Sequence, residues 1–501
     1  MSAEGGEKIA CPLRAAARRA PEDVALIDAA GSLTFGAMDG WVEALAGELE
    51  ARDVSEGDVV ALLLPNGRLA VALLLAVMRC GAVVCPLHGR NPPAMLREQL
   101  GRVGAGVLIG ARVGTVEGVR CLSAVDLEGN NNGAPEPGSE RRVRRPRPTL
   151  AGKSCLPLIE CNRPATMMFT SGSVAVPKVA VHSLWNHVAA ARASNRFHGL
   201  GATDRWLLSL PLCHVGGLAI VFRCLLAGAG ILIPEQGVEL AEAIARFKPT
   251  QLSLVPTQFR RLLAKPAVFG PEVRCILLGG APAPDGLVTE ALARGLPVRK
   301  TYGLTEMTSQ VTAVPPGASG AESMTAGRLL EGCELRLAAD GEILVRGPAL
   351  FLGYGEGGRI VRPVDEEGWF ATGDLGRVAG AGWLTVSGRK DFLFISGGEN
   401  IQPEEIEAAL LGLGEVAQAV VVPVPDVEFG QRPAAFVRMH GGAEVDAARL
   451  ADALRQRIPR YKIPVVFYAL PDDDGARALK VRRRELAEEA RRRVLASETT
   501  E

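Results

Sequence analysis

Residues 169–178 read Phe-Thr-Ser-Gly-Ser-Val-Ala-Val-Pro-Lys and follow the apolar pair Met-Met at 167–168. The apolar residues predict a strand, and the strand ends in a loop of small residues, namely Thr170, Ser171, Gly172 and Ser173. Hydroxyls and free backbone N–H groups at a strand tip can bind an anion, and Lys178 adds a positive charge close by. An ordinary polar turn between two strands fits the same string equally well. The spacing is not that of the P-loop, which ends in Gly-Lys-Ser/Thr, so we expect a phosphate-binding loop of another kind.

The composition describes a globular protein of more than one domain. A chain of 501 residues is too long for one compact core, and 48% hydrophobic with 22% charged residues excludes a disordered chain. Lysine plus arginine equals aspartate plus glutamate, at 56 each, so no net field favours nucleic acid or an acidic membrane. We therefore do not expect a nucleic-acid partner.

Three features indicate a cytoplasmic protein. The ten cysteines include no Cys-x-x-Cys pair, which favours reduced, buried thiols over zinc ligands. The first seven residues are polar and acidic, without the apolar core of a signal peptide. The apolar run 215–233 is nearly long enough to span a membrane, but Arg223 lies at its centre and would be costly in lipid. We expect a buried helix and turn there, and no membrane insertion.

Short apolar runs alternate with segments of helical period through most of the chain. This alternation predicts an α/β fold with largely parallel sheets. Strands are expected at 59–64, 83–87, 205–210, 251–255 and 274–278, and a helix at 69–80. After about residue 334 short β segments take over, with strands expected at 342–346, 369–372 and 383–386.

A second α/β unit begins beyond residue 391. We expect helices at 404–411, 447–458 and 482–495, and strands at 419–423 and 434–439. The change of pattern places a domain boundary at 388–391.

Five further segments carry polar groups where strand ends or turns would expose them. They are Gly-Gly-Ala-Pro at 279–282, Tyr-Gly-Leu-Thr-Glu at 302–306, Thr-Gly-Asp at 372–374, Gly-Arg-Lys-Asp at 388–391 and Ile-Ser-Gly-Gly-Glu-Asn-Ile at 395–401. Small residues let a flat ring lie against the backbone, and a carboxylate on a turn suits a pair of ribose hydroxyls. Each segment taken alone is better explained as a turn or a cap.

Taken in order, these motifs resemble the adenylate-forming superfamily of acyl-CoA synthetases, firefly luciferase and non-ribosomal adenylation domains. The resemblance runs from about residue 25 to 486. It implies a large N-terminal domain of stacked α/β subdomains with a small β-barrel-like part, followed by a small mobile α+β domain. The divisions it implies are 1–388 for the N-terminal domain, 389–391 for the hinge and 392–501 for the C-terminal domain.

The resemblance also assigns the nucleotide site. The loop 170–178 would wrap the β- and γ-phosphates of ATP. Gly280, Ala281 and Tyr302 would bracket adenine, and Thr305 would hold the α-phosphate. Glu306 would ligate Mg²⁺. Asp374 and Arg389 would hold the ribose.

The C-terminal segment carries the other implied roles. The family has a hinge residue where this chain has Asp391, and a thiol-binding face at the positions of Gly397 and Gly398. Its catalytic lysine lies in a Gly-Lys-x-x-Arg-x-x-Leu setting. Lys480 fits that setting, except that Leu479 replaces the glycine.

The implied chemistry explains the need for these groups. A carboxylate is a poor acyl donor, so its attack on the α-phosphate of ATP makes an acyl-adenylate and releases pyrophosphate. The thiol of CoA then displaces AMP. The negative charge spread over the phosphates is stabilised by Mg²⁺, a lysine and backbone donors that are held in place. The reaction needs no nucleophilic side chain.

Four local strings resemble one subfamily, the o-succinylbenzoate–CoA ligases of menaquinone biosynthesis. They are Ser-Leu-Pro-Leu-Cys-His-Val-Gly-Gly at 209–217, Ser-Leu-Val-Pro-Thr-Gln at 253–258, the run 396–405 and Phe-Gly-Gln-Arg-Pro at 429–433. The implied substrate is a dicarboxylic keto-acid.

Arg223 gives an independent argument for such an acid. A buried arginine requires an anionic or carbonyl partner, and the carboxylate that is not activated could be that partner. A salt bridge to a nearby acidic residue accounts for Arg223 equally well. His214 resembles the family position that lines the acyl tunnel, although a hydrogen-bonded core imidazole also fits. Ser309 is a further candidate for the wall of the acyl pocket.

Two other interpretations stay open. The enzyme could act on another carboxylic acid, such as an aryl or medium-chain fatty acid. It could also be a catalytically weakened homologue that only binds, because Val174-Ala175 replaces the usual Thr-Gly of the phosphate loop. The sequence leaves a homodimer as one option.

Overall fold

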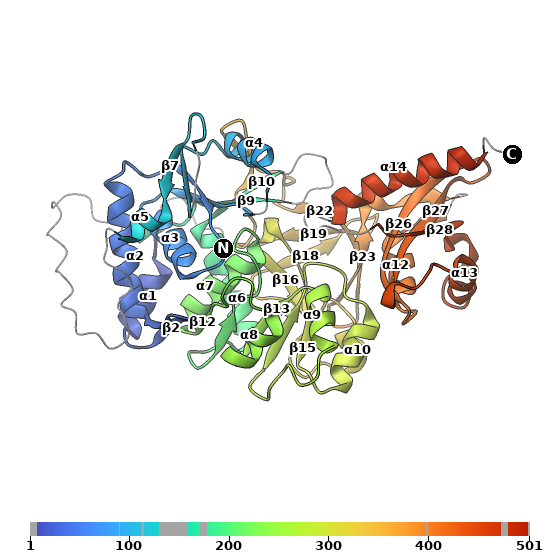
Figure 1. Cartoon of the computed structure of the whole chain (residues 1–501), viewed down its shortest axis with the longest axis horizontal. Coiled ribbons are helices and arrows are strands. Elements are labelled where there is room, and N and C mark those ends of the chain that lie inside the picture. The colour runs from blue at the N-terminus through green and yellow to red at the C-terminus, as the bar shows by residue number, and fades with distance from the viewer. Residues whose placement is uncertain are drawn as a thin grey trace.

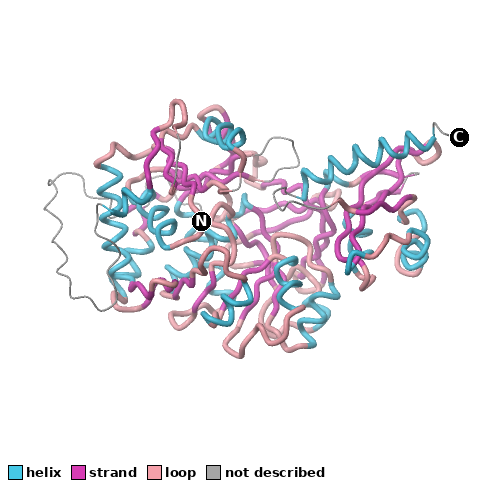
Figure 2. Tube along the Cα trace, in the orientation of Figure 1, coloured by secondary structure: helices cyan, strands magenta, loops and turns pink. Residues whose placement is uncertain are grey.

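The computed structural model describes residues 8–89, 91–111, 115–129, 158–170, 178–396, 399–471 and 479–498. Within these ranges, two large sheets dominate the part before residue 334, and smaller sheets follow (Figures 1 and 2). None of the helices in the described ranges is long and apolar enough to cross a membrane. The cysteines in those ranges are free thiols.

The first sheet has eight described strands. In spatial order they are β21 (Arg359–Val361), β20 (Gly353–Glu356), β10 (Val179–Ser183), β9 (Pro164–Phe169), β5 (Val83–Pro86), β4 (Val59–Leu63), β6 (Val107–Gly110) and β7 (Arg120–Ser123). Strands β9, β5, β4, β6 and β7 are parallel, and β10, β20 and β21 extend the sheet in antiparallel fashion.

The second sheet has nine described strands. Their order is β17 (Arg328–Leu329), β16 (Ser309–Ala313), β15 (Val298–Leu304), β14 (Cys275–Leu278), β13 (Gln251–Leu254), β11 (Arg205–Leu207), β12 (Gly230–Leu232), β2 (Val24–Asp28) and β3 (Gly31–Thr34). The strands from β15 to β2 are parallel. The expected α/β fold with largely parallel sheets is therefore confirmed.

One apolar core joins the two sheets. It combines Leu62 and Val84 of the first sheet with Trp206 and Ile231 of the second. The helices that contribute most to it are α1 (Pro12–Arg19), α2 (Phe35–Glu50), α3 (Arg68–Arg79), α6 (Leu184–His198) and α7 (Val215–Ala227), and the short helix α5 (Ala124–Gly129) adds Ala124 and Leu127. A second core lies on the other face of the nine-stranded sheet under α8 (Leu240–Phe247), α9 (Pro256–Leu263) and α10 (Asp285–Ala293).

The first half of the apolar run 215–233 folds as predicted. It forms α7, whose end is capped by Gly228 in the left-handed region at φ +74°, and Arg223 is buried. The second half is strand β12, which the sequence analysis did not separate from the turn.

The remaining N-terminal elements are short or peripheral. They are β1 (Lys8–Ala10), α4 (Pro93–Val103), α5 (Ala124–Gly129), β8 (Leu158–Glu160), η1 (Thr305–Met307) and α11 (Gly320–Ser323).

An antiparallel sheet of four strands precedes the expected domain boundary. Its strands are β18 (Glu334–Leu337), β19 (Glu342–Arg346), β22 (Phe370–Ala379) and β23 (Trp383–Arg389), and η2 (Lys390–Phe392) follows directly. Ile343 and Phe370 of this sheet pack on Phe351. It provides the small β part expected for the N-terminal domain.

The C-terminal part is an α+β unit with a three-stranded sheet at its centre. Its elements are β24 (Phe394–Ser396), β25 (Glu399–Ile401), α12 (Pro403–Leu411), β26 (Val416–Asp426), β27 (Gly430–Met439), η3 (His440–Gly442), α13 (Ala447–Arg455), η4 (Arg460–Lys462), β28 (Val466–Ala469) and α14 (Leu479–Glu498). Residues of α12 and α13 pack on one face of this sheet and residues of α14 on the other. Figure 1 shows α14 lying along the outside of the unit.

Candidate functional site

The predicted phosphate loop lies between two paired strands. Phe169 of β9 is opposite Val179 of β10, and the backbone N–H of Thr170 donates to the carbonyl of Lys178 at 2.8 Å. Thr170 is buried at the end of its strand. The predicted strand end is confirmed, whereas Ser171, Gly172 and Ser173 lie outside the described residues.

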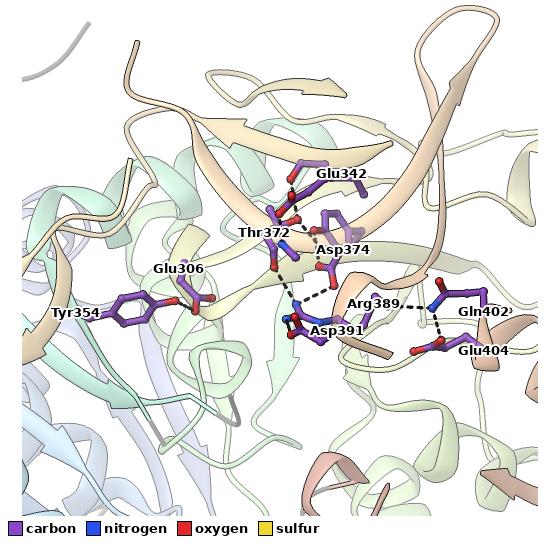
Figure 3. A network of polar contacts seen from close by, with 12 residues as sticks. Glu306, Glu342, Tyr354, Thr372, Asp374, Arg389, Asp391, Gln402 and Glu404 are labelled. Carbon is purple, nitrogen blue, oxygen red and sulfur yellow. Dashed lines mark hydrogen bonds and ion pairs between the residues drawn. The ribbon is translucent and has the colours of Figure 1, made fainter. Parts of the chain in front are cut away.

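Tyr354 brings the end of this loop to the candidate metal ligand. The ammonium of Lys178 lies 4.6 Å from the centre of the Tyr354 ring, and the Tyr354 hydroxyl donates to Oε1 of Glu306 at 2.6 Å (Figure 3). Burial and the Glu306 carboxylate raise the pKa of Tyr354, so its hydroxyl stays protonated and donates. The structure thus joins two predicted residues through a tyrosine that the sequence analysis missed.

Thr305 and Glu306 form a single helical turn between β15 and β16. The hairpin needs Gly303, because a Cβ there would lie 1.7 Å from the carbonyl oxygen of Ser309. The Thr305 carbonyl accepts a hydrogen bond from Nε2 of His182 at 2.7 Å. Burial lowers the pKa of His182 to about 4, so a neutral imidazole holds the turn in place.

The candidate adenine residues lie at one edge of the nine-stranded sheet. Strand β14 pairs in parallel with β15, and the last pair is Leu278 with Lys300. Gly280 lies two residues after the end of β14, and Tyr302 lies two residues beyond that pair within β15. Both residues therefore lie towards the carboxyl ends of adjacent strands. A Cβ at Gly279 would lie 2.7 Å from Cγ2 of Thr301, which explains the small residue there. Ala281, the next small residue, is exposed.

The candidate ribose residues form one hydrogen-bonded network. The Tyr302 hydroxyl donates to Oδ2 of Asp374 at 2.7 Å, and Nη1 of Arg389 lies 3.0 Å from Oδ1 of the same carboxylate. Arg389 also donates to the carbonyl of Thr372 at 2.8 Å and pairs with Asp391 at 3.0 Å. Figure 3 shows Thr372 and Asp374 on one side of the Arg389 guanidinium. The predicted hinge residue is therefore tied directly to the predicted ribose residues.

Charge explains the arrangement of this network. Burial acts to lower the pKa of Arg389, but the carboxylates of Asp374 and Asp391 outweigh it and raise that pKa. Burial and the Asp374 carboxylate raise the pKa of Tyr302. The tyrosine and the arginine thus remain donors at neutral pH, and Asp374 is held by both.

Arg223 has no carboxylate partner among the described residues. Its side chain is 3% exposed, donates from Nη2 to Ser309 Oγ at 3.1 Å and to Gln310 Oε1 at 2.9 Å, and lies 5.2 Å from the centre of the Trp206 ring. Burial lowers the pKa of Arg223 to about 10. Its Nε finds no hydrogen-bond partner in the described part of the chain. The salt-bridge explanation for this arginine is therefore not supported by the described residues.

His214 lies at the N-terminal cap of the same helix. Its ring centre is 6.5 Å from that of His88, and burial together with His88 lowers the pKa of His214. A neutral ring next to the helix that carries Arg223 suits a position in the wall of an acid pocket.

The catalytic lysine candidate lies in the first turn of α14. Three residues after Lys480, Arg483 pairs with Glu407 at 2.8 Å and donates to the carbonyl of Val421 at 3.1 Å. These contacts hold the start of the helix on the C-terminal sheet. Gly397 and Gly398, the candidate thiol face, lie outside the described residues.

The carboxylate of Glu306 suits a magnesium ion that also binds phosphate. Within the described ranges, no group of three or more His, Cys, Asp or Glu side chains could hold a metal ion without further ligands. Magnesium commonly takes one or two carboxylates together with substrate phosphates, and Glu306, joined through Tyr354 to Lys178 of the predicted phosphate loop, matches that pattern.

Comparisons with known proteins agree with this geometry. The family model described as AMP-binding enzyme matches residues 13–355, and the one described as AMP-binding enzyme C-terminal domain matches residues 405–479. The 2-succinylbenzoate–CoA ligase of Salmonella typhimurium is 35% identical over 91% of this chain and 92% of its own length. The enzyme of that name from Geobacillus kaustophilus is 33% identical over 93% of this chain and 95% of its own.

Solved structures show the same similarity in three dimensions. The o-succinylbenzoate CoA synthetase of Bacillus subtilis in complex with the acyl-adenylate intermediate superposes with a TM-score of 0.83, at 30% identity, over 95% of this chain and 98% of that chain. The same enzyme in complex with ATP and a magnesium ion also gives a TM-score of 0.83, over 95% and 99% of the two chains. The chain belongs to the AMP-binding enzyme family, and its relatives there include the 2-succinylbenzoate–CoA ligases.

Proposed function

We propose that this protein is a 2-succinylbenzoate–CoA ligase that activates its acid with ATP. The acid carboxylate attacks the α-phosphate, the acyl-adenylate forms as pyrophosphate leaves, and the thiol of CoA then displaces AMP. The observation that carries the choice of acid is Arg223, a buried cation whose side-chain partners in the described chain are the neutral groups of Ser309 and Gln310 rather than a carboxylate. A second, non-activated carboxylate would supply the charge that this arginine lacks.

The residue roles are part of the same proposal. The loop from Thr170 to Lys178 holds the β- and γ-phosphates, and Thr305 holds the α-phosphate. Tyr302 and Gly280 flank adenine. Bound to Glu306, Mg²⁺ would neutralise the phosphate charge that develops as the bond to pyrophosphate breaks.

Three further residues complete the site. Asp374 and Arg389 bind the ribose hydroxyls, in keeping with the carboxylate that Arg389 and Tyr302 hold in place. Lys480 neutralises the α-phosphate in the first half-reaction. We further propose that the domain beyond the hinge at 389–391 turns between the two half-reactions and exchanges Lys480 for a thiol-binding face around Gly397 and Gly398.

We infer that the enzyme works in the cytoplasm on small molecules. A homodimer would be detected as a doubled mass by light scattering in solution. Neither the location of the enzyme nor its oligomeric state changes the proposed reaction.

The acid assignment is tested by pyrophosphate release with three acids. They are 2-succinylbenzoate, 4-oxo-4-phenylbutanoate, which lacks the ring carboxylate, and 2-butanoylbenzoate, which lacks the side-chain carboxylate. Each monocarboxylate keeps one of the two carboxylates of 2-succinylbenzoate, so the one that is still a substrate shows which carboxylate is activated. Benzoate is added as a fourth acid: its turnover without turnover of the dicarboxylate would point to another acid, and no turnover with any acid to a binding homologue.

Arg223→Met separates recognition from stability. We expect kcat/KM for 2-succinylbenzoate to fall about 10- to 100-fold, because a charge-assisted contact is lost, while kcat/KM for the active monocarboxylate changes little. The ratio of the two values does not depend on the fraction of folded enzyme. Equal losses with both acids would remove the recognition role of Arg223.

A further inference from the structure

Strand β22 leaves its ladder at the residues that carry the ribose-binding aspartate. Glu342 of β19 is opposite Leu375, whereas Leu344 is opposite Ala371, so residues 372–374 of β22 bulge out opposite a single residue of β19. A bulge of this kind leaves backbone N–H groups without a partner on the next strand. The conformation of the Asp374 turn must therefore be held by side chains.

Two side chains accept hydrogen bonds from backbone N–H groups of the bulge. The backbone N–H of Gly373 donates to Oε1 of Glu342 at 2.9 Å, and that of Asp374 donates to Oγ1 of Thr372 at 3.0 Å. Thr372 in turn donates to the carbonyl of Ile343 at 2.7 Å. The Glu342 side chain is only 13% exposed, which makes its hydrogen bond to Gly373 more valuable than one in bulk water.

The second oxygen of Glu342 reaches the proposed hinge. Lys390 donates from Nζ to Oε2 of Glu342 at 2.9 Å and also pairs with Asp340. The Asp340 and Glu342 carboxylates raise the pKa of Lys390. Lys390 is the residue between Arg389, which binds Asp374, and Asp391. One carboxylate thus holds both the ribose turn and the chain that leads into the C-terminal domain.

We propose that Glu342 is a positioning residue that fixes the Asp374 turn for the nucleotide and couples it to the hinge. This inference rests on the proposed nucleotide site. A turn of the C-terminal domain that carries Lys390 away leaves Glu342 bound to Gly373 alone. The ribose turn therefore has a different set of partners in the two half-reactions, although Asp374 itself stays in the N-terminal domain.

The structure offers a matched control for the test. Asp340 shares Lys390 with Glu342 and accepts a hydrogen bond from the backbone N–H of Glu342 at 3.1 Å, but among the described contacts none joins its side chain to residues 372–374, and it is 49% exposed. Glu342→Ala removes both contacts of the carboxylate. Glu342→Gln keeps an oxygen that can accept from Gly373 and loses the charge that attracts Lys390. Lys390→Met removes the hinge partner of both Glu342 and Asp340.

Affinity for ATP with Mg²⁺ is measured by calorimetry in the absence of acid. We expect Glu342→Ala to weaken ATP binding about tenfold, because the bulge loses its acceptor. Glu342→Gln should restore most of that affinity, and Asp340→Asn should stay within about twofold of wild type, as an exposed substitution does. Equal ATP affinity for Glu342→Ala and Asp340→Asn would overturn the positioning role.

The coupling to the hinge is tested by timing the two half-reactions separately. Glu342→Gln and Lys390→Met should each change the ratio of adenylate formation to thioester formation, and the double variant should match Lys390→Met, because the ion pair that Glu342→Gln weakens is already absent there. Additive effects would overturn the coupling. ATP binding by a wild-type protein that does not ligate 2-succinylbenzoate would refute the acid assignment alone, whereas failure to bind ATP would overturn both proposals.

Discussion

The guanidinium of Arg483 lies 2.8 Å from the carboxylate of Glu407, and both side chains are almost fully buried in the C-terminal unit. The same guanidinium lies 4.6 Å from the ring centre of Phe392, which directly follows the proposed hinge residue Asp391. The helix turn that carries Lys480 and the start of the C-terminal unit are therefore held by one arginine.

Removal of that arginine should affect the first half-reaction most. Arg483→Met leaves the Glu407 carboxylate buried without its cation, which costs about 3–5 kcal/mol of unfolding free energy. We expect adenylate formation to fall further than thioester formation from supplied acyl-adenylate, because only the former is proposed to use Lys480. Thermal melts and separate half-reaction rates measure the two effects. The exposed neighbour variant Arg484→Met is the control, and an equal loss in both half-reactions would argue against a role in placing Lys480.

Gly373→Ala should raise the KM for ATP. Gly373 has φ +71°, and a Cβ there would lie 2.8 Å from Nη2 of Arg389, so alanine strains the turn and displaces the guanidinium from Asp374. Gly380→Ala is the control, since Gly380 also has a positive φ, of +50°, but nothing lies within 4 Å of an added Cβ. The KM for ATP is measured by steady-state kinetics with ATP as the varied substrate. A similar KM for the two variants would show that displacement of Arg389 has no effect and that backbone strain alone accounts for any increase.

Tyr302→Phe should separate the ring of this residue from its hydroxyl. The phenyl ring can still face adenine, whereas the 2.7 Å hydrogen bond to Asp374 is lost. We expect ATP affinity to fall about 3- to 10-fold with little change in kcat, in line with one lost hydrogen bond. If Tyr302→Ala binds ATP as well as Tyr302→Phe, the ring does not contact the base.

His182 should make the fold sensitive to acid. Burial lowers its pKa from the ordinary value of 6.5 to about 4, so the unfolded chain binds a proton between these pH values and the folded chain does not. The contribution is therefore fully present above pH 6.5 and is lost as the pH falls to 4. Melting temperatures from pH 4 to 8 should fall less steeply towards acid for His182→Phe than for wild type. Parallel curves for the two proteins would show that the imidazole is not held neutral.

Local pattern was sufficient to predict many elements of the fold. Strand β19 has the predicted bounds, and α12 begins one residue earlier than expected, because each lies between clear turn residues. Strand β12 was missed because the run 215–233 is apolar throughout, and only Gly228 in its left-handed conformation separates helix from strand.

The sequence did not predict those parts of the site that depend on contacts between residues far apart in the chain. Tyr354 meets Glu306 across 48 residues, and Arg483 meets Glu407 across 76. No local spacing predicts such pairs. Tyr354 stands between two glycines, Gly353 and Gly355, and that small-residue setting was the one available signal for a functional ring. Glu342 was predicted only as the first residue of a strand, because its carboxylate acquires a role only when β22 bulges beside it.

The hydrogen bond from Thr170 to Lys178 closes the base of the proposed phosphate loop, directly after β9 and directly before β10. The register of these strands is set by pairs such as Phe169 with Val179, which lie on the strand side of that bond. Substitutions at the seven positions between Thr170 and Lys178 are therefore expected to leave the register unchanged. Nucleotide affinity can then evolve independently of the fold, for example by replacement of Val174-Ala175 with the Thr-Gly of other family members.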